Sequence, residues 1–396
     1  MNLPERPALR RELRFVFDSS RSVIRFEDPC GYVRPDLEFE PEFSALFELL
    51  DGTLTVADLL EHVRSQFDQS VRASQFRRIL QWLDEEFLLD SPLFARARQF
   101  LEADAIKAVC AGSVYPAEPA ALHEYLERIL QSAPARAYPQ HAHAAFIPHI
   151  DFRVAGEHYA YPFNALRQAE FDLIVHIGTS HYGWQDRFLL TTKDFVTPLG
   201  RIKTDRELVE ALRQHVGLPL TRNDIAYQPE HALELHHVFI QHLFPDRHYT
   251  VLPILVTSFH DFVHRSAHPS TDAKVSAFCR ALRDVVHSSG RRPLILVSGD
   301  LAHIGRRFGD AWDAAPMLDQ LRAEDYEVLD AIARGSSSRL FATIARSGDA
   351  RRICGFPPAM TFLEAFTPGE GVMLDYGQWN DLPTKSAVSF GSVVWY

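Results

Sequence analysis

From residue 144 to the C-terminus, short continuously apolar runs alternate with longer stretches whose apolar residues recur at helical spacing. The run Leu294–Val297 is one example, and continuous apolarity with β-branched residues favours a strand that is buried on both faces. The pattern predicts strands at 144–149, 172–178, 187–192, 249–257, 293–300, 371–376 and 387–395, and helices at 157–170, 204–216, 231–244, 272–289, 316–334 and 337–347. Such alternation indicates an α/β fold with a mixed, largely parallel sheet flanked by helices. We expect the last two strands to be antiparallel and to close one edge of the sheet.

The first part of the chain has a different pattern. Residues 14–17 and 22–26 alternate weakly and predict a hairpin. Three amphipathic pieces predict short helices at Pro41–Leu50, Val56–Phe67 and Ala73–Phe87, and a charged helical connector is expected over 90–106. We therefore expect two domains: a small, mostly helical, winged-helix-like domain with its connector over 1–105, and an α/β domain over 106–396.

Composition narrows the class of protein and its partners. The 396 residues carry a formal net charge of −11, which argues against a nucleic-acid partner because such proteins present a basic surface. No apolar run approaches the ~20 residues of a membrane span, and the charged N-terminus lacks the apolar core of a signal peptide. Four scattered cysteines without a CxxC pair favour reduced thiols over a disulfide framework. We therefore expect a cytoplasmic protein without membrane association.

Several of the 19 histidines stand where predicted strands end, which is where ligands bind in open α/β sheets. His149 ends one strand, His181 follows the next, and Asp300 and His303 follow a third. His231 stands at the beginning of a predicted helix, and its helical neighbours are apolar, so it is expected to point inward. We expect these side chains to converge on one site.

Imidazoles and a carboxylate at one site are ligands that iron, zinc and copper accept. A set of two histidines and one carboxylate also leaves coordination positions open for substrate or oxygen. The candidate carboxylates are Glu230, Glu234 and Asp300, and sequence spacing does not choose among them. The same histidines are able to act as general acid and base without a metal, so both chemistries stay open.

The chain from about Lys107 to Tyr396 resembles the Memo family, whose motifs it carries in the family's order. The similar segments are AGSVYP (111–116), IPHIDFRVAG (147–156), IGTSHYG (177–183), FVTPLGRIKTD (195–205), PEHALELHHVFIQHLF (229–244), VLPILV (251–256), SGDLAHIG (298–305) and RICGFPPAM (352–360). Ordered matches over about 290 residues make a chance resemblance improbable.

The resemblance implies a fold akin to the LigB-type, class III extradiol dioxygenases, with a metal-site pocket. It implies that His149, His181 and His231 bind a divalent transition metal, for which we expect iron, with zinc or copper as alternatives. Asp300 and His303 would then orient a ligand or act as acid and base. Some family members have a cysteine immediately before the histidine of the motif that SGDLAHIG resembles. This chain has Ala302 at that position, which excludes thiolate ligation from it.

Two functions are consistent with this resemblance. The first is an iron-dependent, dioxygenase-like oxidoreductase in a modification pathway, because bacterial relatives are associated with an AMMECR1-like protein and a radical-SAM enzyme. The segment LDGTLTVADLL, at 50–60, resembles PqqD-like peptide-binding domains, which would suit such a pathway, although a plain interaction or dimerisation module fits it equally. The second is a non-enzymatic scaffold that binds a peptide or metabolite in a vestigial pocket. Family likeness alone does not transfer an activity.

Overall fold

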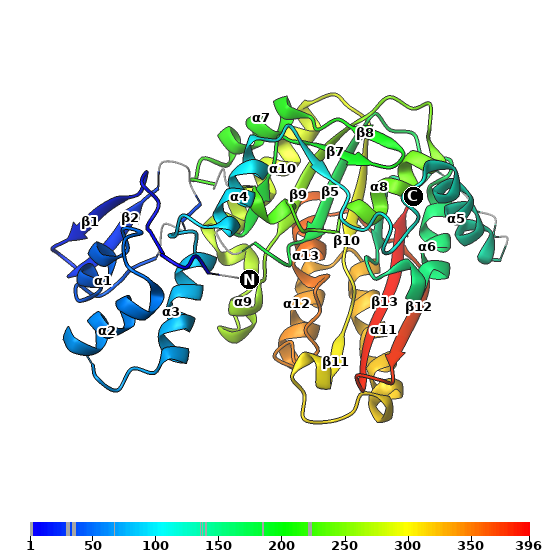
Figure 1. Ribbon diagram of the computed structural model, residues 1–396. Helices are drawn as coiled ribbons and strands as arrows, with labels where there is room; N and C mark the ends of the chain where they lie inside the picture. Colours follow the sequence, from blue (N-terminus) through cyan, green and yellow to red (C-terminus); the bar gives the residue numbers. More distant parts are fainter. Residues whose placement is uncertain are drawn as a thin grey trace. The chain divides into compact units, whose positions relative to one another are not determined.

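The computed structural model describes residues 3–28, 32–33, 37–66, 68–134, 136, 138, 141–183, 186–220 and 224–396. The chain forms two compact units (Figure 1). The smaller consists of Met1–Asp104 and Thr221–Ile225, and the larger of Ala105–Leu220 and Ala226–Tyr396.

The smaller unit contains the predicted hairpin and helices. Strands β1 (Arg14–Asp18) and β2 (Val23–Glu27) pair antiparallel, and the helices are α1 (Phe43–Leu49), α2 (Val56–Gln66), α3 (Ala73–Glu85) and α4 (Pro92–Glu102). Helix α3 buries Phe76, Leu80 and Leu83, which share one face at helical spacing. Phe67, the last residue of the predicted second helix, lies outside the described residues.

The larger unit is built on a mixed sheet, and this confirms the predicted fold class. Its strands in the described residues are β4 (Ala144–Ile147), β5 (Leu173–Thr179), β6 (Phe188–Leu190), β9 (Thr250–Val256), β10 (Pro293–Ser298), β11 (His303–Gly305), β12 (Val372–Asp381) and β13 (Ser386–Trp395). Their order is β11-β13-β4-β10-β5-β9-β6. The four central strands β4, β10, β5 and β9 are parallel, whereas β6, β11 and β13 are antiparallel to their neighbours. Strand β12 pairs antiparallel with β13, as the sequence predicted for the last two strands.

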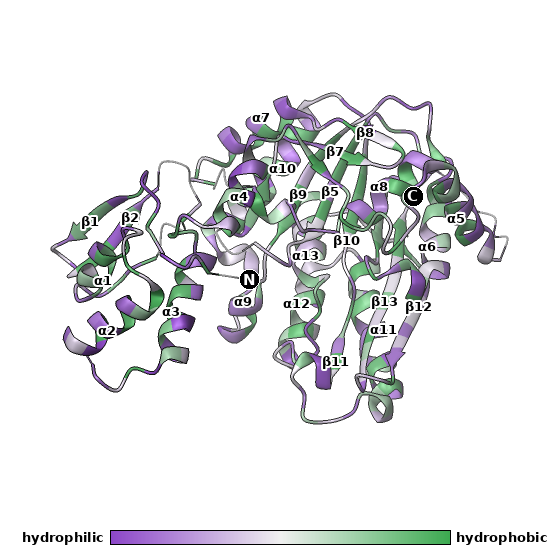
Figure 2. Cartoon of the chain, viewed as in Figure 1, coloured by the Kyte–Doolittle hydropathy of each residue, from purple (hydrophilic) through white to green (hydrophobic). Residues whose placement is uncertain are grey.

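Helices cover both faces of this sheet. They are α5 (Pro119–Ser132), α6 (Phe152–Leu166), α7 (Arg206–Val216), α8 (Glu234–Leu243), α9 (His260–His264), α10 (Ala273–Ser288), α11 (Leu318–Ala333), α12 (Ser337–Arg346) and α13 (Phe356–Phe366). Successive strand side chains point to opposite faces, so both faces of β5 are buried, and Figure 2 shows β5 as hydrophobic. Helix α13 packs on β5, β9 and β10, and α6 packs on β4 and β13.

Some elements were not predicted from the sequence. Helix α13 is buried on nearly every side, so its apolar residues show no helical periodicity, and it begins with two prolines that are tolerated in a first turn. A separate small sheet joins β3 (Ala105–Lys107), β7 (Asp194–Thr197) and β8 (Gly200–Ile202). Helix α8 begins at Glu234, three residues later than predicted, so His231 lies in the turn that precedes it.

None of the helices in the described part of the chain combines the length and the apolarity that crossing a membrane requires.

Candidate metal centre

His149, His181 and His231 converge at the carboxyl ends of the parallel strands. His149 follows β4, His181 follows β5, and His231 precedes α8. Their ring centroids are 5.0 Å apart for His149–His181 and His181–His231, and 5.4 Å apart for His149–His231. Each ring offers one nitrogen, and the three nitrogens lie within 4.8 Å of one another. This is the spacing at which three imidazoles can share one metal ion.

The hydrogen bonds of His149 decide which of its nitrogens faces this cluster. Ser298 Oγ donates to the carbonyl of Ala232 at 2.5 Å, so its single hydrogen is already used. His149 Nδ1, 3.1 Å from Ser298 Oγ, therefore carries the hydrogen and donates it. The lone pair of His149 is left on Nε2, on the side of the ring that faces the other donor groups.

Glu230 fixes His181 in the same way. The carboxylate accepts the backbone N–H of His181 at 2.8 Å and its Nδ1–H at 3.0 Å, so the lone pair lies on Nε2. Glu230 also accepts the backbone N–H groups of His231 and Ala232, at 2.9 and 3.0 Å. A carboxylate that holds Nδ1–H while Nε2 faces a metal is the arrangement common in histidine metal sites.

Burial and charge set the protonation of these groups. Burial lowers the pKa of His149 well below its usual value, and neighbouring imidazoles lower it further. Burial also lowers the pKa of His231. Burial alone would raise the pKa of Glu230, but the hydrogen bond and charge of His181 outweigh it and the pKa is lowered. Burial alone would lower the pKa of His181, but its hydrogen bond to Glu230 and the charge of that carboxylate raise it. At neutral pH the centre therefore offers unprotonated imidazoles at His149 and His231, whereas a metal ion would have to displace the proton that Glu230 favours on His181.

A second donor set shares His149. Cys354 Sγ lies 3.3 Å from His149 Nε2, and Asp300 Oδ2 lies 3.8 Å from the same nitrogen. The three donor atoms lie within 4.8 Å of one another. Cys354 was not selected from the sequence, although it belongs to the RICGFPPAM segment that carries the family resemblance. Cys354 thus places a thiol beside His149, although position 302 holds an alanine.

Two glycines allow the backbone next to Cys354 to approach the backbone next to Asp300. A Cβ on Gly299 would lie 2.2 Å from the Cα of Gly355, and a Cβ on Gly355 would lie 2.7 Å from the carbonyl oxygen of Asp300. The two backbones are therefore in direct contact, and Gly355 N–H donates to Asp300 O at 2.8 Å. This contact is the physical reason for glycine at position 299.

In the second donor set, burial favours the protonated forms of the acidic groups Asp300 and Cys354. Burial raises the pKa of Asp300 to about 7 and raises that of the Cys354 thiol well above its usual value. Asp300 also accepts the backbone N–H of His149 at 3.0 Å. Metal ligands must be deprotonated, so a cation bound here would displace these protons.

His303 and Glu234 lie outside both donor sets. His303 Nδ1 is 3.2 Å from the carbonyl of Leu301 and 3.1 Å from that of Arg352, so Nδ1–H donates to backbone, and burial lowers its pKa to about 4. Glu234 accepts the backbone N–H groups of Val109 and Cys110 and the hydroxyl of Tyr115. Of the three candidate carboxylates, Glu230 thus orients His181, Asp300 stands beside His149, and Glu234 anchors the AGSVYP segment.

A cavity of about 360 Å³ opens beside the centre. His181 and Cys354 line it together with other polar and apolar side chains, namely Thr179, Ser180, Ser258, Phe259, His260, Asp349, Arg352, Ile353, Phe356 and Pro357. His149 is 2% exposed, whereas the side chains of His181 and His231 are 30% and 32% exposed. The centre is therefore closed to solvent at His149 and accessible to solvent at the other two imidazoles.

Three further buried histidines form a chain behind the centre. His236 Nε2–H donates to the carbonyl of Pro148 at 2.8 Å, because a carbonyl can only accept. His176 Nε2–H then donates to His236 Nδ1, and His237 Nε2–H donates to His176 Nδ1, both at 3.1 Å. His237 Nδ1 is left buried without a partner among the described residues. The chain joins β5 to α8 and ends on the peptide that carries His149.

Comparison with known proteins identifies the family. The sequence profile of the Memo family, described as "Memo-like protein", matches residues 107–394. A MEMO1 family protein of Aquifex aeolicus is 28% identical over 390 residues, which cover 94% of this chain and 96% of that protein. A MEMO1 family protein of Thermus thermophilus is 26% identical over 285 residues, covering 72% and 80%. The Protein memo-1 homolog of Caenorhabditis elegans is 26% identical over 262 residues, covering 64% and 69%.

The alignment with the Aquifex protein and the family profile cover different shares of the chain. A match over 94% of the chain includes most of the first hundred residues, so the Aquifex protein is similar to this chain in both parts. The family profile covers the part that holds the histidines, and it spans well over half of the sequence. On this evidence, the chain belongs to the Memo family.

Proposed function

We propose that this protein is a metal-dependent enzyme of the oxidoreductase class, with iron held by His149, His181 and His231 and with an oxygenase-like reaction. The observation that carries the proposal is the convergence of three imidazoles, two of which have their lone pairs aimed by Ser298 and Glu230. A hydrogen bond to Nδ1–H raises the basicity of a metal-binding imidazole and fixes the direction of its Nε2 lone pair. A histidine in a solvated loop does not need such a bond.

The residues around the centre suit a reaction on a small substrate. The cavity beside His181 has about 360 Å³ and a mixed polar and apolar lining, as small-molecule sites do. A transition metal bound there would supply Lewis-acid or redox chemistry. Asp300, whose pKa burial raises to about 7, stands beside His149 and can hold or release a proton near neutral pH.

Cys354 adds a sulfur donor to the proposal. His149 belongs to both donor sets, and Cys354 Sγ lies 3.3 Å from its Nε2. Thiolate and imidazole ligands together favour iron, copper and zinc over magnesium or calcium. Zinc and copper therefore stay as alternatives to iron.

Elemental analysis of the protein purified without oxygen tests the proposal. We expect about one transition-metal ion per chain, and loss of that ion in the double variant His149→Ala/His181→Ala. His215→Ala/His287→Ala is the matched control, because it removes two exposed imidazoles, on α7 and α10, that belong to neither donor set and should leave the metal content unchanged. Full metal content in the first variant would refute the proposal.

Cobalt(II) gives an independent measurement of the sulfur donor. A thiolate bound to cobalt produces an intense near-ultraviolet charge-transfer band, which we expect in the unaltered protein and not in Cys354→Ser. Cys279→Ser is the control, because Cys279 is a buried free cysteine that belongs to neither donor set. A band of equal intensity in Cys354→Ser would exclude Cys354 as a ligand.

A second part of the proposal concerns the smaller unit and the partners of the protein. We propose that the enzyme works in a modification pathway with radical-SAM and AMMECR1-like proteins, and that the smaller unit recruits a peptide. In support, β1 pairs on one side with β2, and its Phe15 and Phe17 are 47% and 54% exposed. Exposed aromatic residues on an edge strand suit the addition of an extended peptide. Co-expression with those two proteins from the same genome should give a complex that Phe15→Ser/Phe17→Ser weakens, and a complex that this variant leaves intact would refute the role of β1.

A further inference from the structure

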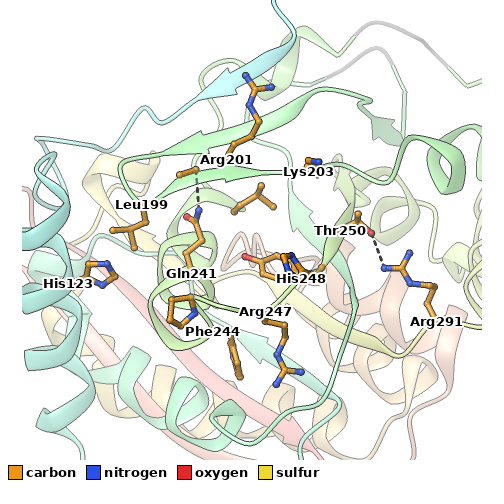
Figure 3. A pocket seen from close by; sticks show the side chains of 14 residues that line it. His123, Leu199, Arg201, Lys203, Gln241, Phe244, Arg247, His248, Thr250 and Arg291 are labelled. Carbon is orange, nitrogen blue, oxygen red and sulfur yellow. Dashed lines mark hydrogen bonds between the residues drawn. The ribbon is translucent and has the colours of Figure 1, made fainter.

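A basic cavity lies in the larger unit, lined by residues from the β7–β8 hairpin, the end of α8 and the loop that follows it (Figure 3). Its volume is about 530 Å³, within the usual range for small-molecule sites. Its basic lining residues are Arg201, Lys203, Arg247, Arg291, His123 and His248, and no aspartate or glutamate lines it. This composition is opposite to that of the whole chain, which has 52 acidic and 41 basic residues.

Two of the four strong cations are already neutralised. Arg201 pairs with Asp194 at 3.1 Å, and Figure 3 shows its side chain extending away from the other basic residues. Arg291 pairs with Asp172 at 2.8 Å and with Asp205 at 3.2 Å. No carboxylate in the described part of the chain pairs with Lys203 or with Arg247, so these two contribute positive charge that no described acidic group compensates.

Arg247 is held in place without using its charge. Its guanidinium carbon lies 4.8 Å from the ring centroid of Phe171 and 4.9 Å from that of Phe244. One nitrogen, Nη1, donates to the carbonyl of Phe171 at 3.2 Å. A cation fixed by rings and by a neutral carbonyl keeps most of its donors for another group and loses little conformational entropy when that group binds.

Neutral groups complete the cavity. Leu199, Ile202 and Phe244 give it apolar walls, and the β7–β8 turn that bears Leu199 depends on Gly200, whose φ is +124°. Gln241 stiffens this turn, since its Nε2 donates to Gly200 O at 3.1 Å and its Oε1 accepts from Thr197 at 2.5 Å. The imidazole of His248 lies between the basic residues in Figure 3 and offers a further hydrogen bond. The cavity thus joins two uncompensated positive charges to an apolar wall.

We propose that this cavity binds a small phosphorylated molecule, with the phosphate among its basic lining residues, where Lys203 and Arg247 add unpaired positive charge, and the organic part against the apolar wall. A phosphate monoester carries about two negative charges at neutral pH, which matches the two uncompensated cations. Arginine and lysine are the side chains that recognise phosphate most often.

The binding site for this molecule is distinct from the histidine centre. Thr250, which begins β9, and Arg291, which precedes β10, both line the cavity. His181 and Asp300 follow the opposite ends of β5 and β10, which run parallel to each other. The six residues of β10 alone span roughly 20 Å, so the phosphorylated molecule does not reach the histidines.

Calorimetric titration of the full chain tests the proposal. Bound metal is first removed with a chelator, so that phosphate cannot bind at the histidine centre. The probes are inorganic phosphate, glycerol phosphate and adenosine monophosphate, with succinate as a dianion that lacks phosphorus, at about 0.15 M salt to screen non-specific attraction. We expect both phosphate esters to bind more tightly than succinate, and Lys203→Gln and Arg247→Gln each to weaken them about tenfold.

Matched variants remove the same charges elsewhere in the larger unit. Lys107 is an exposed lysine on β3 of the same small sheet, and Arg322 is an exposed arginine on α11. Lys107→Gln and Arg322→Gln should leave affinity within about twofold of the unaltered protein, and all variants should keep its melting temperature. The proposal is overturned if no phosphate probe binds, if succinate binds as tightly as the esters, or if the control variants weaken binding equally. Tighter binding of free phosphate than of either ester would assign the cavity to the inorganic ion and overturn the role of the apolar wall.

Discussion

Glu230 and Glu234 are the same residue type four positions apart in the chain, yet they hold different parts of the molecule. Glu230 accepts from the ring and backbone of His181 and from the backbone of His231. Glu234 accepts from Val109, Cys110 and Tyr115 and belongs to neither donor set among the described residues. Because both carboxylates are buried, their removal should have different consequences for metal affinity and for stability.

We predict that Glu230→Gln lowers metal affinity by about 10- to 100-fold, since an amide neither accepts as strongly from His181 nor supplies charge to it. Glu234→Gln should leave metal affinity nearly unchanged and lower the free energy of unfolding by about 1–3 kcal/mol, because it impairs buried hydrogen bonds. Competition with a metal indicator and urea unfolding measure the two quantities. Equal losses of affinity in the two variants would contradict the role assigned to Glu230.

The chain of His176, His236 and His237 connects one strand to one helix. His176 is the middle ring and uses both nitrogens, whereas His237 is an end ring whose Nδ1 has no partner in the described residues. Burial lowers the pKa of His236 to about 4 and that of His237 to about 3, so the rings are neutral in the folded protein. Their hydrogen bonds therefore join neutral groups with fixed directions.

Removing the middle ring, His176, should lower the free energy of unfolding more than removing the end ring, His237. His176→Leu leaves both His236 Nδ1 and His237 Nε2–H buried and unpaired, which should cost about 2–6 kcal/mol. His237→Leu breaks one bond and only moves the unpaired acceptor to His176, so we expect a cost of about 1 kcal/mol. Urea unfolding ranks the two variants, and a larger cost for His237→Leu would show that the directions assigned here are wrong.

The sequence predicted the elements that place the histidines, and the reasons are local. Continuous apolar runs gave the central strands, and residues that follow strand ends necessarily lie at one edge of a parallel sheet. Cys354 could not be predicted this way, because it reaches His149 through the contact between Gly299 and Gly355, which are far apart in the chain. Choosing between Glu230 and Glu234 likewise required the true start of α8.

At the scale of the whole molecule, the two units have separate hydrophobic cores. The core of the smaller includes Ile24, Phe47 and Leu59, and the core of the larger includes Val175, Phe278 and Leu363. All donor groups of the candidate centre belong to the larger unit. Metal binding should therefore act on the stability of one unit and leave the other as it is.

We predict two calorimetric unfolding transitions, since units with their own cores unfold as separate cooperative bodies. Metal at a hundredfold excess over its dissociation constant stabilises the folded state that binds it by about 2.7 kcal/mol. For a unit as large as Ala105–Leu220 with Ala226–Tyr396 this corresponds to a rise of about 5 °C in the melting temperature of its transition. The transition of the smaller unit should not move, and neither transition should move in His149→Ala/His181→Ala. A metal-induced shift that persists in this variant would mean that the stabilising ion binds outside the histidine centre.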